Sequence, residues 1–431
     1  MIKTIQADGA SEYALFEKMR NRSVETDRAV TATVSDIIEA VRTRGDEAVR
    51  EYTAKFDKRC PEHFEVPREQ INDALTEADP DFVSAILNAQ ENIAAFHQRQ
   101  KAQSFIDAQP NGVILGQRVR GLKRVGLYVP GGTAAYPSSV LMNAIPAKIA
   151  GVEELIMVTP PGPDGKPNPD ILTAAAICGV DRVFLMGGAQ AVAALAFGTQ
   201  SVPRVDKIVG PGNIFVATAK KLLFGVVDID MIAGPSEILI MADDTANASF
   251  VAADLMGQAE HDRMASAVLL TTSERLAKET VEALARQIQT LPRREIIEAS
   301  LKGYGAIILC GNEAQMVELA NTLAPEHLEV QVRDPMRLVG VLDNAGSVFL
   351  GEYTPEPLGD YYAGPNHVLP TSGTARFFSP LGVDSFVKRS AFLYYTKEAM
   401  QQSAADILTI AAREGLSAHG NAVQVRLDDA F

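Results

Sequence analysis

The sequence contains few cysteines, and they follow no recognisable pattern. Among its 431 residues only Cys60, Cys178 and Cys310 are cysteines, and they lie far apart without any CxxC pair. This spacing excludes the disulfide framework of a small secreted domain. Residues 1–5 lack the apolar core of a signal peptide. A reducing cytoplasm is therefore the expected compartment.

Long apolar runs and basic clusters are also missing. The apolar run at residues 171–180 stops at Asp181 and Arg182, well short of the ~20 residues that a membrane-spanning helix needs. The chain has 54 acidic and 40 basic residues, for a net charge of −14. Such a negative net charge argues against nucleic acid or an anionic membrane as the main partner, although a local basic pocket for a cofactor remains possible.

The length and the composition indicate a globular protein of more than one domain. Hydrophobic residues make up 47% and charged residues 22% of the chain, which is ordinary for such a protein. Because one domain typically spans about 100–200 residues, we expect at least two.

The first part of the chain, residues 1–120, is expected to be mainly helical and to pack on the second α/β unit. Apolar residues recur at helical spacing over 34–56. Asp79 followed by Pro80 predicts the start of a second long helix that runs to about residue 100.

Apolar strands alternate with turns and helices over the next two segments. This pattern predicts a Rossmann-like open, largely parallel α/β sheet over 121–236 and a second α/β unit over 237–385. Ligands of such sheets bind outside the carboxyl ends of the strands. Residues 386–431 are predicted to be a tail with a helix over 396–413 and a strand over 421–427. This tail would have to dock, on this chain or on another subunit, for its residues to act.

Histidine is scarce, and four of the six histidines lie in the C-terminal half. Gln258 and His261 are three residues apart at the end of a predicted helix, so they share one face. His327, His367 and His419 lie in polar segments rich in turn-forming residues. Imidazole nitrogens and amide oxygens are plausible metal ligands, and we hypothesise that the fold gathers these segments around a metal. The alternative is an ordinary solvated helix end.

Two further polar segments are candidates for chemistry. Glu326 stands beside His327, where the imidazole suits proton transfer and a buried carboxylate suits the activation of water. Asp360 and His367 lie in a loop rich in glycine and proline, a position for a metal ligand and a substrate contact. A polar turn and a solvated loop are the structural alternatives.

Three glycine-rich turns follow predicted strands, at residues 130–132, 187–190 and 210–213. Their amides can approach a phosphate, but none matches the GxGxxG dinucleotide pattern. A nucleotide cofactor and a purely structural use both remain open. Cys178 ends an apolar helix, so a buried thiol is favoured over a nucleophile that attacks an aldehyde.

Taken together, these segments resemble the histidinol dehydrogenase family over nearly the whole chain. The resemblance rests on seven specific motifs, at residues 125–132 (VGLYVPGG), 187–191 (GGAQA), 209–213 (VGPGN), 233–237 (AGPSE), 258–261 (QAEH), 325–327 (PEH) and 366–370 (NHVLP).

The resemblance implies a zinc-dependent enzyme that oxidises L-histidinol to L-histidine through L-histidinal, with reduction of two NAD⁺, as the last step of histidine biosynthesis. It implies an intertwined homodimer with one zinc ion per subunit. The implied zinc ligands are Gln258, His261, Asp360 and His419, with His419 supplied by the partner subunit.

The resemblance also assigns the other site residues. Glu326 and His327 become the proton-transfer pair: His327 accepts the hydroxyl proton and Glu326 activates the water that hydrates the aldehyde. The NAD contacts fall on Tyr128, Gln190 and Asn213. The substrate contacts fall on Ser236, Gln258, His261, His327, Asp360, His367, Glu414 and His419.

Three other functions stay open at this point. A related zinc dehydrogenase would use another amino alcohol or a diol as its substrate. A zinc hydrolase would use Glu326 as its base without NAD, although the three glycine turns speak against it. A metal-binding scaffold would have no need of an acid/base pair.

Overall fold

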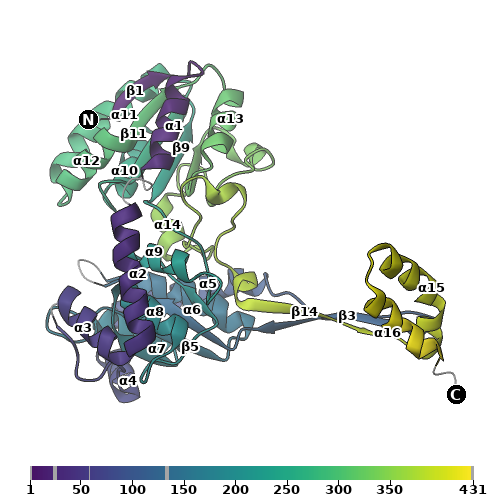
Figure 1. Ribbon diagram of the computed structural model, residues 1–431. Helices are drawn as coiled ribbons and strands as arrows, with labels where there is room; N and C mark the ends of the chain where they lie inside the picture. Colours follow the sequence, from purple (N-terminus) through teal and green to yellow (C-terminus); the bar gives the residue numbers. More distant parts are fainter. Residues whose placement is uncertain (1, 23–26, 58, 132–134, 429–431) are drawn as a thin grey trace. The chain divides into compact units, whose positions relative to one another are not determined.

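The computed structural model describes residues 2–22, 27–57, 59–131 and 135–428 (Figure 1). The chain forms two compact units, Met1–Gln100 with Leu122–Phe386, and Lys101–Gly121 with Val387–Phe431. The segment expected over 1–120 is thus shared between both units. Within the described ranges, no helix combines the length and the apolar character needed to cross a bilayer.

The first sheet of the larger unit is parallel, with strand order β6–β5–β4–β7–β8. Its strands are β4 (Arg124–Tyr128), β5 (Glu154–Thr159), β6 (Arg182–Leu185), β7 (Lys207–Val209) and β8 (Asp228–Ile229). The central strands are buried on both faces, which explains their nearly continuous apolar sequence.

Helices cover both faces of this sheet. One apolar core joins it to α4 (Arg68–Glu77), α5 (Pro80–Gln98), α6 (Pro137–Ala150) and α7 (Pro169–Ile177). The other core joins it to α2 (Asp27–Arg44), α3 (Asp46–Phe56), α8 (Gly188–Phe197) and α9 (Ile214–Leu223). The prediction of an open parallel α/β sheet is confirmed.

The second sheet of the larger unit is also parallel, in the order β1–β11–β10–β9–β12–β13. Its strands are β1 (Lys3–Gln6), β9 (Glu237–Ala242), β10 (Ser266–Thr271), β11 (Gly305–Leu309), β12 (His327–Gln331) and β13 (Ser347–Leu350). The helices are α10 (Ala248–Ala259), α11 (Glu274–Gln287) and α12 (Arg294–Tyr304) on one face, and α1 (Ser11–Asn21) and α13 (Glu313–Leu323) on the other. The N-terminal strand therefore completes a sheet whose other strands come from beyond residue 236.

The smaller unit is an antiparallel ribbon that carries two helices. Its strands are β2 (Phe105–Ala108), β3 (Ile114–Gly121) and β14 (Val387–Tyr394), with β3 in the centre. The helices α15 (Lys397–Arg413) and α16 (Ser417–Asp428) pack against each other. The strand predicted over 421–427 is wrong, because these residues belong to α16. Packing on α15, where Gly420 lies near Leu408 and Ala411, outweighs the strand-like alternation of the sequence.

Two local predictions in the helical region have different outcomes. The Asp79 carboxylate accepts hydrogen bonds from the amides of Asp81 and Phe82, at 2.8 and 3.2 Å, so the predicted start of α5 is confirmed. The continuous helix predicted over 34–56 is wrong. Gly45 adopts a φ of +58°, which ends α2 and starts α3 in a new direction.

Candidate active site

The Glu326–His327 pair lies at the amino end of the six-stranded sheet. Helix α13 ends at Ala324 in the left-handed conformation, and His327 is already the first residue of β12. Its backbone pairs with Ile238 of β9 and Ser347 of β13. The turn after α13 thus places this pair at the opposite edge of the sheet from the carboxyl strand ends.

His327 is buried with one ring nitrogen engaged. Its Nδ1 lies 3.0 Å from the carbonyl oxygen of Glu237. Since a carbonyl only accepts, Nδ1 carries the hydrogen and Nε2 keeps its lone pair. Nε2 has no hydrogen-bond partner within the described ranges. Burial lowers the pKa of His327 to about 4, so the ring is neutral at pH 7 and able to accept a proton.

Glu326 is held by the same backbone segment. Its Oε2 accepts a hydrogen bond from the Glu237 amide at 2.9 Å and lies 3.7 Å from His327 Nδ1. Burial raises the pKa of Glu326 well above its usual range. A carboxylate with a raised pKa is a stronger base towards water than an exposed one.

The end of α10 and the short helix α14 (Glu356–Tyr361) bring further polar groups to this region, and the two helices pack against each other. Both side-chain atoms of the Gln258 amide are buried and lack a partner among the described residues. His261 is exposed and lines a cavity of about 460 Å³ together with Tyr361. Gln258 therefore offers a buried, unused ligand atom next to a histidine at a cavity wall.

His367 also belongs to this group. Its Nδ1 lies 3.1 Å from the Asp360 carbonyl oxygen and 3.8 Å from Asp360 Oδ1. Burial is the main cause of the lowered pKa of His367, while the charge of His261 lowers it further and that of Asp360 raises it. Three of the predicted residues are thus electrostatic neighbours.

Glu356 is a site residue that the sequence analysis missed. The ligand atoms of His327, Glu356 and Asp360 lie within 4.8 Å of one another, and Glu356 Oε1 is buried without a hydrogen-bond partner in the described structure. Only Asp360 is common to this cluster and to the four ligands implied by the family resemblance. The spacing of Glu356 and Asp360, four residues apart and hence on one helical face, was the available signal.

The remaining predicted substrate residues are placed as follows. Ser236 precedes β9 and is half-buried, and its carbonyl accepts a hydrogen bond from the Ser266 amide at 3.0 Å. Glu414 caps the C-terminus of α15 and His419 lies in α16, both exposed within the smaller unit. Their relation to the groups above rests on the resemblance alone.

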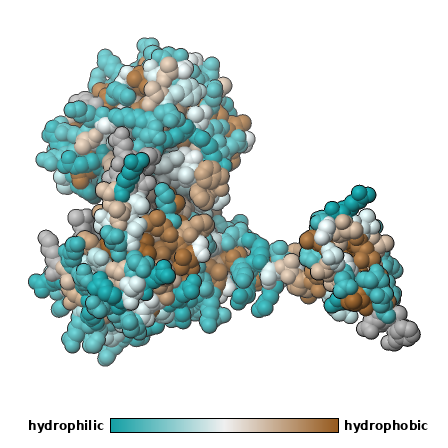
Figure 2. Space-filling model, viewed as in Figure 1, coloured by the Kyte–Doolittle hydropathy of each residue, from teal (hydrophilic) through white to brown (hydrophobic). Residues whose placement is uncertain are grey.

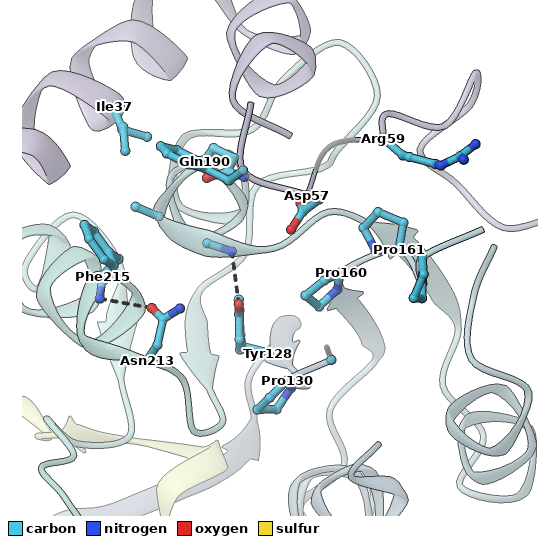
Figure 3. A pocket seen from close by; sticks show the side chains of 16 residues that line it. Ile37, Asp57, Arg59, Tyr128, Pro130, Pro160, Pro161, Gln190, Asn213 and Phe215 are labelled. Atoms are coloured by element: carbon cyan, nitrogen blue, oxygen red, sulfur yellow. Dashed lines mark hydrogen bonds between the residues drawn. The ribbon is translucent and has the colours of Figure 1, made fainter. Parts of the chain in front are cut away.

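The predicted NAD residues line one pocket of about 1060 Å³ at the carboxyl ends of β4 to β7 (Figure 3). The Tyr128 hydroxyl accepts a hydrogen bond from the Gly188 amide at 3.0 Å, and Asn213 Oδ1 caps α9. The Gln190 amide is buried and has no partner in the described ranges. Gly132, at the end of the first predicted glycine turn, lies outside the described residues.

The walls of this pocket are mainly apolar, with few polar groups. They include Phe56, Pro130, Pro160 and Pro161, and the carboxyl group of Asp57 is drawn among them (Figure 3). An apolar cleft with a few fixed polar groups is typical of a cofactor site. Phe56 and Asp57 were missed because they come from α3 and its end, far from the glycine turns in sequence.

The glycine turn after β7 supports this pocket through a close backbone contact. Gly210 has a φ of +115°, and a Cβ there would lie 2.1 Å from the Tyr128 carbonyl oxygen. We expect Gly210→Ala to lower the free energy of unfolding by ~3 kcal/mol or more, because strain and a backbone clash combine. Urea unfolding measures this loss.

Gly225→Ala is the matched control for this prediction. Gly225 has a φ of +99° but no atom within 4 Å of the added Cβ, so only backbone strain remains. We expect it to cost ~1–2 kcal/mol. Equal losses in the two variants would show that the contact with Tyr128 is unimportant.

The comparisons with known proteins agree on one family. A sequence profile described as histidinol dehydrogenase matches residues 20–427. A histidinol dehydrogenase of Clostridium acetobutylicum is 52% identical over 426 residues, which cover 99% of each chain. One from Listeria innocua is 52% identical over 421 residues, 98% of each. The crystal structure of histidinol dehydrogenase from Elizabethkingia anophelis superposes with a TM-score of 0.88 at 38% identity, over 92% of each chain. This chain therefore belongs to the histidinol dehydrogenase family.

Proposed function

We propose that this chain oxidises L-histidinol to L-histidine through L-histidinal, with NAD⁺ as the hydride acceptor in both steps. The observation that carries the proposal is the buried Glu326–His327 pair, in which one group is a neutral imidazole with a free Nε2 and the other a carboxyl group whose pKa is raised by burial. Two different oxidations at one site need two such bases, one for a hydroxyl and one for water.

In the first step, His327 Nε2 accepts the proton of the substrate hydroxyl as hydride leaves the carbinol carbon. The hydrogen bond from His327 Nδ1 to the Glu237 carbonyl oxygen keeps the imidazole ring oriented. The imidazolium formed lies 4.0 Å from Asp360 Oδ1, and the charge of this carboxylate favours the protonated ring.

In the second step, the aldehyde takes up water before it can lose hydride again. Glu326 accepts a proton from that water as its oxygen adds to the carbonyl carbon. The gem-diolate so formed gives up the second hydride to NAD⁺ and becomes the carboxylic acid. Keeping the reactive aldehyde in one site protects it from side reactions between the two steps.

We further propose that Gln258, His261, Asp360 and His419 hold a zinc ion. Nitrogen and oxygen ligands are those that zinc takes, and the unpartnered amide of Gln258 fits such a role. Bound zinc would supply a Lewis acid that holds the amine and imidazole groups of the substrate. Ser236, His367 and Glu414 complete the proposed substrate contacts, and Tyr128, Gln190 and Asn213 those of NAD.

The proposed assembly is a homodimer in which His419 and Glu414 reach the site of the partner subunit. Exposed apolar side chains on β14 and on the C-terminal helices support it, since they suit burial against another chain (Figure 2). These residues are Phe392, Leu393, Tyr394, Ile407, Ile410 and Val425. The cytoplasm, where the three free cysteines stay reduced, is the proposed compartment.

The test is the amount of NADH formed per L-histidinol consumed, with and without a zinc chelator. We expect two NADH per substrate, a loss on chelation and recovery on addition of zinc. NADH from another alcohol but not from histidinol would keep the chemistry and change the substrate. No NADH from any alcohol would overturn the proposal.

Glu326→Gln separates the two oxidations. Glutamine preserves the shape of the side chain and can still accept the Glu237 amide hydrogen, but it cannot take a proton from water. We expect histidinal oxidation to slow by about 10²–10³-fold and histidinol oxidation by much less. Single-turnover measurements with each substrate test this, and equal losses would remove Glu326 as the base for water.

A further inference from the structure

A buried ion pair lies directly behind the Glu326–His327 pair. Arg22 follows α1, Glu237 begins β9, and Arg22 Nη2 lies 2.8 Å from Glu237 Oε1. The two side chains are only 0% and 4% exposed. Arg22 Nη2 also donates a hydrogen bond to the carbonyl of Pro235 at 2.7 Å. One guanidinium therefore holds the chain at two points where it enters β9.

The backbone of Glu237 contacts both proposed bases. Its amide donates to Glu326 Oε2 at 2.9 Å, and its carbonyl accepts from His327 Nδ1 at 3.0 Å. The hydrogen bond from the Glu237 amide aligns the Glu326 carboxylate. The hydrogen bond to the Glu237 carbonyl places the imidazole hydrogen of His327 on Nδ1. The orientation of the backbone at Glu237 thus decides which atoms of the two bases are free to react.

Stability alone is a poor explanation for this ion pair. Desolvating two charges costs several kcal/mol per ion in real proteins, and buried pairs can often be replaced by apolar side chains without loss. This pair is not even fully satisfied, because Arg22 Nε, Arg22 Nη1 and Glu237 Oε2 lack hydrogen-bond partners in the described structure. What the pair provides is a fixed direction for the segment between Pro235 and Glu237, which includes the proposed substrate contact Ser236.

We propose that Arg22 and Glu237 are positioning residues: their ion pair fixes the backbone of Glu237 so that His327 presents Nε2 and Glu326 stays aligned. The inference rests on the proposed function for the roles of the two bases. The inference assigns no contact with substrate to Arg22. Loss of Arg22 is therefore expected to affect turnover rather than the binding of substrate.

The double variant Arg22→Met/Glu237→Leu tests this proposal without leaving a single buried charge unpaired. We expect it to fold and unfold cooperatively like the parent protein. The kcat of both oxidations should fall about 10–100-fold through misalignment of the bases, with the KM values for histidinol and NAD⁺ little changed. Arg124→Met/Glu154→Leu is the control, because that pair, 2.6 Å apart, lies at the amino ends of β4 and β5, away from the bases.

The second readout is the tautomer of His327, from ¹⁵N NMR of the histidine rings with His327→Gln to assign the signal. We expect hydrogen on Nδ1 in the parent and a mixture of tautomers in the double variant. This measurement needs no substrate, so it separates failure of this inference from failure of the proposed function. Parental kcat and an unchanged tautomer in the double variant would overturn the proposal.

If the double variant does not fold, Arg22→Lys takes its place. Lysine keeps the charge but lacks the planar fork, so it cannot reproduce the geometry of the two contacts from one rigid group. We expect a lower kcat at unchanged KM and partial conversion of the His327 tautomer. A parental kcat with the parental tautomer would contradict the inference.

Discussion

Replacement of His327 by alanine is expected to lower turnover by about 10³–10⁴-fold, the upper part of the range for loss of a general base. The variant loses a buried imidazole whose Nε2 has no hydrogen-bond partner among the described residues and whose Nδ1 is already engaged. Zinc content should stay at the parental level, because His327 is not among the proposed ligands. Steady-state kinetics and elemental analysis of the same preparation measure the two quantities.

His63→Ala is the control for this variant, since the His63 side chain is 84% exposed and lies outside the candidate site. It should leave turnover and zinc unchanged. Strong residual activity of His327→Ala would remove this residue as the base. Loss of zinc together with activity would place His327 in the metal site, with Glu356 and Asp360 as its neighbours within 4.8 Å.

A chain that ends at Leu416 is expected to lose both zinc and nearly all activity. It lacks α16 and therefore His419, which leaves three proposed ligands, Gln258, His261 and Asp360. Zinc sites with three protein ligands are known, but the truncation removes the one proposed ligand that the partner subunit would supply. Zinc retained at the parental level would show that His419 is not a ligand.

The point variant His419→Ala separates loss of a ligand from loss of the helix. His419 is exposed within α16, so its replacement should leave the fold intact while zinc and activity fall. Subunit exchange then tests where the ligand acts. A mixture of His419→Ala and His327→Ala chains should regain part of the parental activity, because a hybrid dimer with shared sites contains one complete site. No recovery after verified exchange would argue against a ligand from the partner subunit.

Much of the local structure follows from the sequence because its causes are local. Nearly continuous apolar runs between turns predict parallel strands covered on both faces, and both parallel sheets have this form. Asp79 and Asn213 cap helices through bonds to amides two and three residues ahead. The glycine turns after strands lead to the large pocket, since the carboxyl ends of parallel strands share one edge.

The family of the protein could also be predicted from the sequence, through its motifs rather than through the spacing of single residues. Glu326 and His327 are recognisable as a pair from the sequence, because adjacent residues stay close together in any fold. The family assignment is confirmed by the comparisons, whereas the ligand set and the substrate contacts remain predictions. Glu356 was missed because its ligand atom meets His327 only after α14 has folded against β12.

Only the tertiary structure decided which distant segments meet. The strand at 3–6 completes a sheet formed by residues beyond 236, and the strand at 114–121 pairs with the one at 387–394. Helix α16 replaces a predicted strand because its partner, α15, supplies the packing. The backbone of Glu237 is hydrogen-bonded to Glu326 and His327, some 90 residues later in the chain, and its side chain pairs with Arg22, more than 200 residues earlier. Such contacts leave no periodic trace in the sequence, because each depends on one side chain at one point of a completed fold.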